Sequence, residues 1–133
     1  LYQARVARPG DQVTIAAYGP MVKVGLVAAA AAAEDGVSIE VIDLRSLSPL
    51  DIATIEASVH KTGRLVVAHE ASVFGGFGAE IAARITERCF YHLEAPVLRV
   101  GAFHLPYPPS RYEEDFLPDL DRVLDAVDRC LAY

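Results

Sequence analysis

The sequence has little cysteine, little basic charge and no long apolar run. Its two cysteines, Cys89 and Cys130, lie in apolar helical patterns without a CxxC motif or a histidine at ligand spacing. This pattern argues against a disulfide framework and against a metal site. It predicts two reduced thiols in the core of a cytoplasmic protein.

Basic side chains are too few and too scattered to form a patch. The chain has 12 lysines and arginines against 18 acidic residues, which gives a formal net charge of -6. Nucleic acid and an anionic membrane are therefore excluded as expected partners. The longest strongly apolar stretch, residues 24–33, is far shorter than the ~20 residues that cross a bilayer, and no signal-peptide pattern precedes it.

The length and the hydrophobic content indicate one domain. A chain of 133 residues with 53% hydrophobic content supports a single packed core, so we expect residues 1–133 to form one domain. The chain begins with Leu1-Tyr2, and its only methionine is Met21. We therefore expect a piece of a longer protein, to which part of the function belongs.

Short apolar runs alternate with helical patterns along the whole chain. Strands are predicted at residues 13–17, 37–44, 65–68 and 97–100, and the last helix at residues 120–131. Single helices between strands imply parallel strands covered on both faces. Residues 5–11, reversed at Pro9-Gly10, can add a short edge strand. We expect a three-layer α/β/α domain with a mostly parallel sheet.

Glycine and proline mark the expected helix ends. Pro20 suits the first turn of a helix that ends near Gly36, a candidate left-handed cap. Ser48-Pro49-Leu50-Asp51 is typical of a capping box, with Ser48 as the N-cap of a helix that ends at Gly63.

The stretch HEASVFGGFGAEIAARI, residues 69–85, places a histidine, an acid and three glycines between a strand and a helix. Its glycine spacing matches neither a dinucleotide fingerprint nor a P-loop. The favoured interpretation is a tight turn with close backbone approach to a neighbouring surface. His69 is either a general base oriented by Glu70 or, as we favour, a partly buried histidine whose hydrogen bonds hold the loop.

A second candidate region is the proline-rich, aromatic stretch AFHLPYPPSRY, residues 102–112. Exposed aromatic and arginine side chains are frequent anchors of protein interfaces, so one hypothesis is a surface recognition loop. The other is a loop that packs its aromatic side chains on its own domain. The sequence does not distinguish the two.

Six blocks of sequence resemble one known family. VTIAAYGPMV, IEVIDLRSLSPLD, KTGRLVVAHEA, GGFGAEIAARI, APVLRV and DFLPDLDRVLDAV together resemble the C-terminal domain of transketolase-like enzymes. More closely, they are similar to the beta subunit of the decarboxylating component of thiamine-diphosphate-dependent 2-oxo acid dehydrogenases. The resemblance covers essentially the whole chain and implies a five-stranded mixed sheet with one antiparallel strand. It also implies that Leu1 follows the linker between the beta subunit's two domains.

The family's activity implies that this domain is not catalytic. In the family, alpha and beta subunits form a heterotetramer that decarboxylates a 2-oxo acid and acylates lipoyl groups of a dihydrolipoyl acyltransferase. Thiamine diphosphate and Mg²⁺ lie between the alpha subunit and the beta subunit's other domain. The chain has no Gly-Asp-Gly motif for them, and the resemblance places the catalytic histidine before Leu1. The implied role is subunit association and docking of the acyltransferase's subunit-binding domain.

The resemblance assigns candidate residues to these two roles. The subunit-interface candidates are His69, Glu70, Gly75, Gly76, Phe77, Gly78 and Glu80. The candidates for partner docking are Phe103, His104, Tyr107, Arg111, Tyr112 and Tyr133.

Three points depart from the family or stay open. The family's Asp-x-Pro-Tyr type segment has His104 in place of the aspartate, so that aspartate's contacts are not carried over. Residues 101–129 look closer to bacterial branched-chain enzymes than to pyruvate enzymes. The alternatives are a stand-alone module that binds a small molecule, and the C-terminal domain of another transketolase-like enzyme such as a deoxyxylulose-phosphate synthase or a transketolase.

Overall fold

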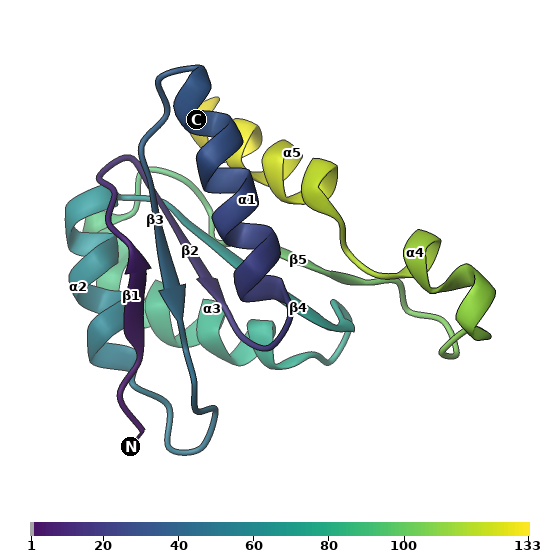
Figure 1. Cartoon of the computed structure of the whole chain (residues 1–133). Coiled ribbons are helices and arrows are strands. Elements are labelled where there is room, and N and C mark those ends of the chain that lie inside the picture. Colours follow the sequence, from purple (N-terminus) through teal and green to yellow (C-terminus); the bar gives the residue numbers. More distant parts are fainter. Residues whose placement is uncertain (1) are drawn as a thin grey trace.

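The computed structural model describes residues 2–133 as a five-stranded sheet between helices (Figure 1). The strands are β1 (Arg5–Arg8), β2 (Val13–Ala17), β3 (Ile39–Asp43), β4 (Leu65–Ser72) and β5 (Leu98–Ala102). The helices are α1 (Met21–Glu34), α2 (Ile52–Thr62), α3 (Phe77–Cys89), α4 (Glu113–Phe116) and α5 (Leu120–Leu131), with 3-10 turns at Phe90–His92 and Ser110–Tyr112. The sheet order is β1-β3-β2-β4-β5, and β1 alone is antiparallel. The predicted α/β/α fold with a mixed sheet is confirmed.

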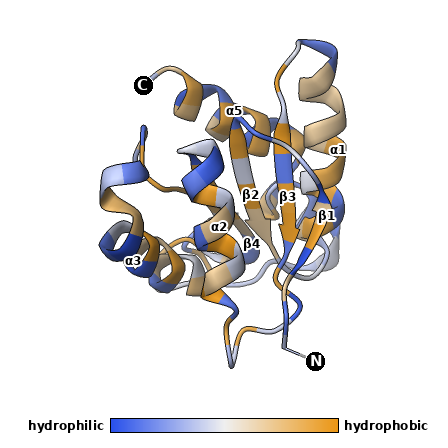
Figure 2. Ribbon diagram, turned by 90° about the vertical axis from the view of Figure 1, so that its left-hand side faces the viewer, coloured by the Kyte–Doolittle hydropathy of each residue, from blue (hydrophilic) through white to orange (hydrophobic). Residues whose placement is uncertain are grey.

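Two hydrophobic clusters lie on opposite faces of the sheet. The first joins β2 and β3 to α1 and α5, and the second joins the other face to α2 and α3. Adjacent residues of β2 enter different clusters, Ile15 the first and Ala16 the second, because side chains alternate along a strand. Figure 2 shows the hydrophobic colouring of β2 and β3 between the helical layers. Cys89 and Cys130 are both buried and free, one in each cluster.

Most predicted element ends are confirmed, and one is wrong. Gly36 and Gly63 adopt positive φ at the ends of α1 and α2, as expected. The capping box led by Ser48 does not form, because Asp51 is the N-cap of α2. Its carboxylate accepts hydrogen bonds from Thr54 N at 3.2 Å and from Ala4 N at 3.0 Å. The tie to Ala4, 47 residues away, depends on tertiary structure.

The end of β4 also differs from the prediction. Strand β4 continues to Ser72, so the residues expected to begin a loop at His69 are still in the sheet. The extension is stabilised by β5, where Ser72 pairs with Ala102 and Val73 N donates to Ala102 O. At the end of α3 the sequence pattern left either Cys89 or Phe90 as the inward residue, and the structure buries Cys89 and exposes Phe90.

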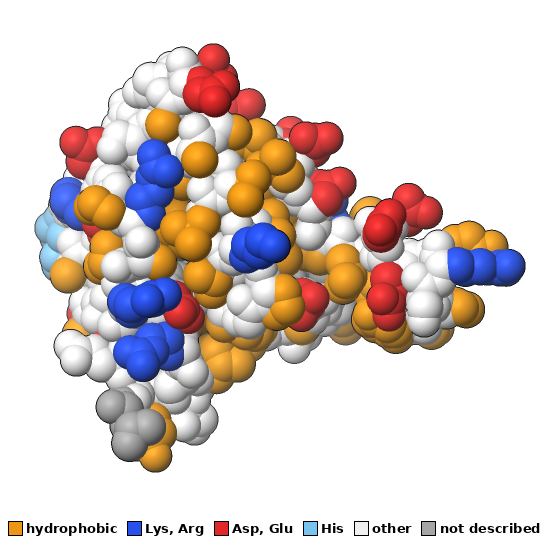
Figure 3. All heavy atoms as spheres, in the orientation of Figure 1, with side chains coloured by type: hydrophobic (Ala, Val, Ile, Leu, Met, Phe, Trp, Pro, Cys, Tyr) orange, Lys and Arg blue, Asp and Glu red, His pale blue; other side chains and the backbone are white. Residues whose placement is uncertain are grey.

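An arm, residues 103–118, leaves the body of the domain after β5. It contains α4 and the preceding 3-10 turn, which pack on each other and project away from the sheet (Figure 1). Within the arm, the Tyr107 and Phe116 rings lie 5.4 Å apart and the Tyr107 hydroxyl donates to Glu113 at 2.9 Å. Hydrophobic and acidic side chains share its surface (Figure 3).

Candidate functional site

His69 lies at the centre of the candidate site, on β4. Its side chain is fully buried, and its Nδ1–H donates to Ala71 O at 2.9 Å. The other ring nitrogen, Nε2, is buried without a hydrogen-bond partner among residues 2–133. Glu70 follows it in the same strand, so the two side chains face opposite sides of the sheet. The structure does not support a general base oriented by Glu70 and agrees with a histidine that holds the loop.

Three glycines from two segments, the start of α3 and β5, enclose the imidazole. A Cβ added at Gly76 would lie 2.8 Å from His69 Cε1, and one at Gly101 would lie 2.9 Å from the same atom. At Gly78 it would overlap the ring, 2.8 Å from Cδ2. The glycine loop therefore permits a close backbone approach, as predicted, and the surface that it approaches belongs to this chain. Gly75, with φ +70 and open space around it, serves the turn instead.

Burial lowers the pKa of His69 from its ordinary value of 6.5. The hydrogen bond to Ala71 opposes this change, and the positive charge of Arg99 adds to it. A neutral imidazole with its proton on Nδ1 donates to Ala71 O, the one acceptor within reach of the ring in the described part of the chain. A second proton on Nε2 would have no acceptor in the glycine cradle.

This environment predicts a loss of stability in acid. In the unfolded chain His69 binds a proton below pH 6.5, whereas in the folded chain its pKa is lower. Its contribution is therefore fully present above pH 6.5 and is lost as the pH falls towards the folded pKa. The unfolding temperature of a His69→Gln variant should depend less on pH between 7 and 5 than that of the wild type. The wild type takes up as much as about one more proton on unfolding in this range, and the variant loses that uptake.

The matched control for this variant is His104→Gln, because His104 is exposed on the arm. It should keep the wild-type dependence of the unfolding temperature on pH. Equal slopes for His69→Gln and the wild type would contradict the assignment of this acid sensitivity to His69.

The remaining loop candidates divide by exposure. His69 and Gly78 are enclosed by the chain itself, so they present no surface to a partner. Phe77 is half-buried against the core cluster of α2 and α3. Gly75 and Glu80 are exposed, and they remain candidates for an interface.

Glu70 lies half-buried at the carboxyl end of β4. Burial raises the pKa of the Tyr18 hydroxyl, and the Glu70 charge raises it further. The Tyr107 hydroxyl in the arm also has a raised pKa, mainly from its hydrogen bond to Glu113, with a smaller effect of Glu70. The charge of Glu70 therefore acts on the hydroxyls of both tyrosines, although it is the smaller cause in each case.

The docking candidates lie on two separate surfaces. Five belong to the arm, and they are Phe103, His104, Tyr107, Arg111 and Tyr112. Tyr133 instead lines a pocket of about 590 Å³ with Phe90, Leu93, Pro96 and other residues, here called the C-terminal pocket. Leu105, 66% exposed, and Phe74, 72% exposed, were not predicted. The only sequence feature that could have indicated their exposure is that each is an apolar residue directly before a proline or a glycine in a loop.

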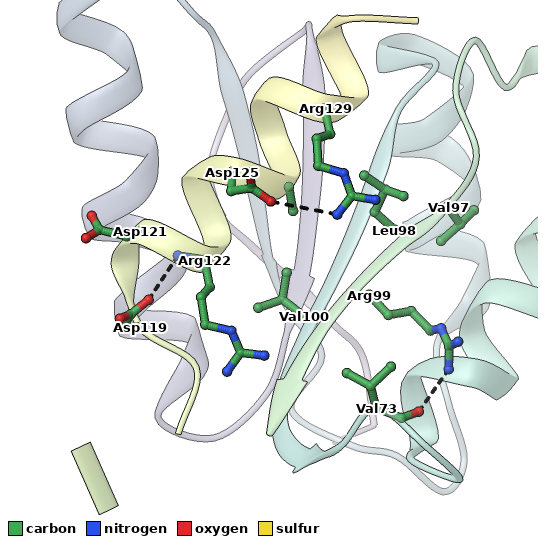
Figure 4. A pocket seen from close by; sticks show the side chains of 11 residues that line it. Val73, Val97, Leu98, Arg99, Val100, Asp119, Asp121, Arg122, Asp125 and Arg129 are labelled. Atoms are coloured by element: carbon green, nitrogen blue, oxygen red, sulfur yellow. Dashed lines mark hydrogen bonds and ion pairs between the residues drawn. The ribbon is translucent and has the colours of Figure 1, made fainter. Parts of the chain in front are cut away.

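A groove of about 510 Å³ runs between α5 and β5, and the sequence did not indicate it (Figure 4). Arg99 donates from Nη1 to Val73 O at 2.9 Å. Further along the groove, Arg129 pairs with Asp125 at 3.7 Å. Because β5 is the edge strand of the sheet, the groove borders backbone that no further strand of residues 2–133 covers.

The site does not fit a magnesium-bound diphosphate. Within residues 2–133 no three His, Cys, Asp or Glu side chains are grouped so that they could hold a metal ion. Two of the three acids that line the α5 groove are engaged locally: Asp119 accepts from Arg122 N and Asp125 pairs with Arg129. Across the same part of the chain, no helix is long and apolar enough to cross a membrane.

The comparison with known families decides the classification. A family described as transketolase, C-terminal domain, matches residues 2–123. The chain belongs to this family. The match covers the sheet, the glycine cradle and the arm, so the resemblance in the six sequence blocks is confirmed.

Similar transketolase C-terminal domains occur in longer proteins. Over all 133 of its residues the chain is 54% identical to the pyruvate dehydrogenase E1 component subunit beta of Leifsonia xyli. The aligned part is 40% of that protein. Over 129 residues, 96% of its length, the chain is 53% identical to the 3-methyl-2-oxobutanoate dehydrogenase subunit beta of Mycobacterium tuberculosis. The aligned part is 37% of that protein. The chain thus spans about two fifths of these relatives.

A solved structure gives the same result for the fold. A split gene transketolase, described as an inactive beta4 tetramer, superposes with a TM-score of 0.80 at 30% identity. The match covers 98% of this chain and 41% of that one.

Proposed function

We propose that this chain is the assembly domain of the beta subunit of a 2-oxo acid dehydrogenase, in its thiamine-diphosphate-dependent decarboxylating component. Two relatives that are 54% and 53% identical to the chain over the aligned residues support this, because they are named as beta subunits of 2-oxo acid dehydrogenases. The observation that carries the proposal is the arm, on which the apolar side chains of Leu105, Tyr107 and Tyr112 are 66%, 63% and 47% exposed. Exposed apolar side chains gathered on one projection are typical of an interaction surface.

The domain itself has no catalytic role in this proposal. Thiamine diphosphate and Mg²⁺, which supply the decarboxylation chemistry of the whole enzyme, are held by the alpha subunit and the rest of the beta subunit. This is consistent with the absence of a metal-ligand group among residues 2–133. His69 has its ring enclosed by glycines and cannot reach a substrate without opening the fold. The whole enzyme oxidatively decarboxylates its substrate in the cytoplasm and passes the acyl group to lipoyl groups of the acyltransferase.

The two exposed surfaces have different partners. Five of the six residues expected to dock the acyltransferase lie on the arm, next to the interface candidate Gly75. The proposal therefore changes their role: the arm contacts the alpha subunit and the second beta subunit of a heterotetramer, and only Tyr133 keeps the docking role. The C-terminal pocket receives the subunit-binding domain of the dihydrolipoyl acyltransferase. Phe90 and Tyr133, 64% and 73% exposed, form its apolar rim, and Glu94 adds an acidic side chain that is paired with Arg64 at 2.7 Å. An apolar centre with a charged rim is typical of protein interfaces.

The substrate is a branched-chain 2-oxo acid, with pyruvate as the alternative. The relatives include beta subunits with either name. Residues 101–129 resemble the bacterial branched-chain enzymes, and His104 replaces the aspartate of the family segment.

The proposal predicts assembly and docking that can be measured separately. The beta subunit that carries this chain should form a heterotetramer with its alpha subunit, as measured by light scattering. Calorimetric titration of that enzyme with the acyltransferase's subunit-binding domain should show saturable binding. Replacing Phe90 and Tyr133 by serine should weaken docking by about tenfold or more, because exposed aromatic side chains are frequent binding hot spots, and should leave the heterotetramer intact.

The matched control is Val27→Ser, which removes an apolar side chain, 48% exposed, from α1. It should change neither assembly nor docking. The proposal is wrong if the isolated chain binds thiamine diphosphate with Mg²⁺ or turns over a 2-oxo acid unaided.

A further inference from the structure

A pocket with two arginines and no acidic lining residue lies at the base of the arm. It has a volume of about 390 Å³, and its lining includes Phe74, Gly75, Arg99, Phe103, His104 and Arg122. We call it the arginine pocket. The chain as a whole carries a net charge of -6, so a pocket whose only charged lining residues are arginines is not expected from its composition. The pocket also lies at the carboxyl ends of β4 and β5, where parallel sheets commonly bind ligands.

Arg122 has hydrogen-bonding capacity that the chain does not use. Its Nη2 donates to Gly101 O, and its guanidinium lies 4.6 Å from the centre of the Phe103 ring. Its Nη1 is buried and has no acceptor among residues 2–133. Buried donors are almost always satisfied in native proteins, so an acceptor from outside this chain is expected. Phe103, half exposed at the start of the arm, is the side chain that would turn aside to admit it.

Arg99 offers a second guanidinium. It is exposed on the edge strand β5, and Nη1 uses one hydrogen bond on Val73 O. Within the described part of the chain, neither Arg99 nor Arg122 has a carboxylate within 4.0 Å of its guanidinium nitrogens. Figure 4 shows the two arginines, one on β5 and one on α5, at the same end of the α5 groove.

Aromatic rings surround these cations. Phe74, 72% exposed, stacks against His104 with ring centres 4.4 Å apart, and Phe103 covers Arg122. Exposed rings beside unpaired arginines are characteristic of the centres of protein interfaces. A free small anion would leave the rings in water, whereas a partner surface would cover them. The pocket is also continuous with the arm.

We infer that the arginine pocket receives a carboxylate side chain of a partner subunit, bound by Arg99 and Arg122, when the enzyme assembles. The inference rests on the proposed function, because it assumes that the arm contacts another subunit. A carboxylate can accept two hydrogen bonds from each planar guanidinium, which a lysine could not supply in the same geometry. The surrounding rings exclude water and thereby strengthen the pairing.

The test uses the assembled enzyme and removes the charges one at a time. Arg99→Gln, Arg122→Gln and the double variant of the beta subunit are compared with the wild type by the dissociation constant of the heterotetramer at 50 and 500 mM NaCl. The double variant should assemble about tenfold more weakly at 50 mM NaCl and should lose most of the wild-type salt dependence. Arg99→Gln alone keeps the contact of Arg122 with Gly101, so it tests the charge without altering the fold.

Arg84→Gln, a half-exposed arginine on α3 without an ion pair in residues 2–133, is the matched control and should behave as wild type. Unchanged assembly and unchanged salt dependence in the double variant would overturn the inference. So would saturable binding of inorganic phosphate to the 133-residue chain that Arg99→Gln abolishes while assembly is unaffected, because the pocket would then hold a small anion. A wild-type beta subunit that never assembles would instead overturn the proposed function itself and, with it, the partner of the pocket.

Discussion

Replacing Gly78 by alanine should lower the free energy of unfolding by about 2–3 kcal/mol, the upper part of the range for overpacked cores. The added Cβ would overlap the buried ring of His69, 2.8 Å from its Cδ2 atom. The ring has little room to retreat, because the backbones of Gly76 and Gly101 lie against its other side, so near that an added Cβ would come within 2.8 and 2.9 Å of Cε1. Alanine gains about 1 kcal/mol of helix propensity over glycine, which the overlap exceeds. Urea unfolding monitored by circular dichroism gives the change directly.

A matched substitution separates the overlap from helix propensity. Gly25 lies in α1, and a Cβ there would lie 3.3 Å from Ile15 Cγ2, a tight contact with one methyl group but no overlap. Gly25→Ala should therefore stay within about 1 kcal/mol of wild type. In a His69→Ala background, Gly78→Ala should become nearly neutral, since the ring that it overlaps is gone. A loss of the same size in both backgrounds would show that His69 is not the cause.

The layers of the fold could be predicted because their signals are local. The β-branched runs at residues 13–17 and 65–68 and the glycines that end α1 and α2 each act within a few residues of the chain. The parallel order then follows from single-helix crossovers. The antiparallel edge strand β1 was recognised from Pro9-Gly10.

The details that failed depend on residues far apart in the sequence. Asp51 caps α2 and also binds Ala4, so the local Ser48 pattern was misleading. Polar residues after Ala68 were assigned to a loop, yet pairing with β5 keeps them in the strand. Nothing local to Gly101 indicates that it lies against His69.

The same limit applies to the candidate site. The residue types of the arm favoured an interface and internal packing equally, because a sequence pattern does not specify which side a proline-rich loop turns to. The structure shows that Tyr107 and Phe116 pack within the arm while Leu105 remains exposed. The arginine pocket could not be predicted from the sequence, because its residues are far apart in the chain. Arg99 and Arg122 are 23 positions apart, and Phe74 lies 25 positions before Arg99.

Replacing Leu105 and Tyr107 of the arm by serine should weaken assembly of the beta subunit with the alpha subunit by about 30-fold or more. Both side chains are more than 60% exposed, Leu105 66% and Tyr107 63%, on a projection that the domain does not cover. A hot-spot side chain at an interface contributes 2 kcal/mol or more, and each ~1.4 kcal/mol corresponds to tenfold in affinity. The dissociation constant is measured by sedimentation velocity over a dilution series.

The control removes similar apolar surface elsewhere, with Val27→Ser and Tyr91→Ser, 48% and 96% exposed. That pair should assemble as wild type does. Tyr107 also packs on Phe116 and donates to Glu113 within the arm, so its replacement can change the arm itself. Leu105→Ser alone leaves those contacts in place and should still weaken assembly, which separates loss of the contact surface from loss of arm structure. Equal affinity of the arm variant and the control pair would contradict an arm that contacts another subunit, and the exposed apolar side chains would then need a different partner.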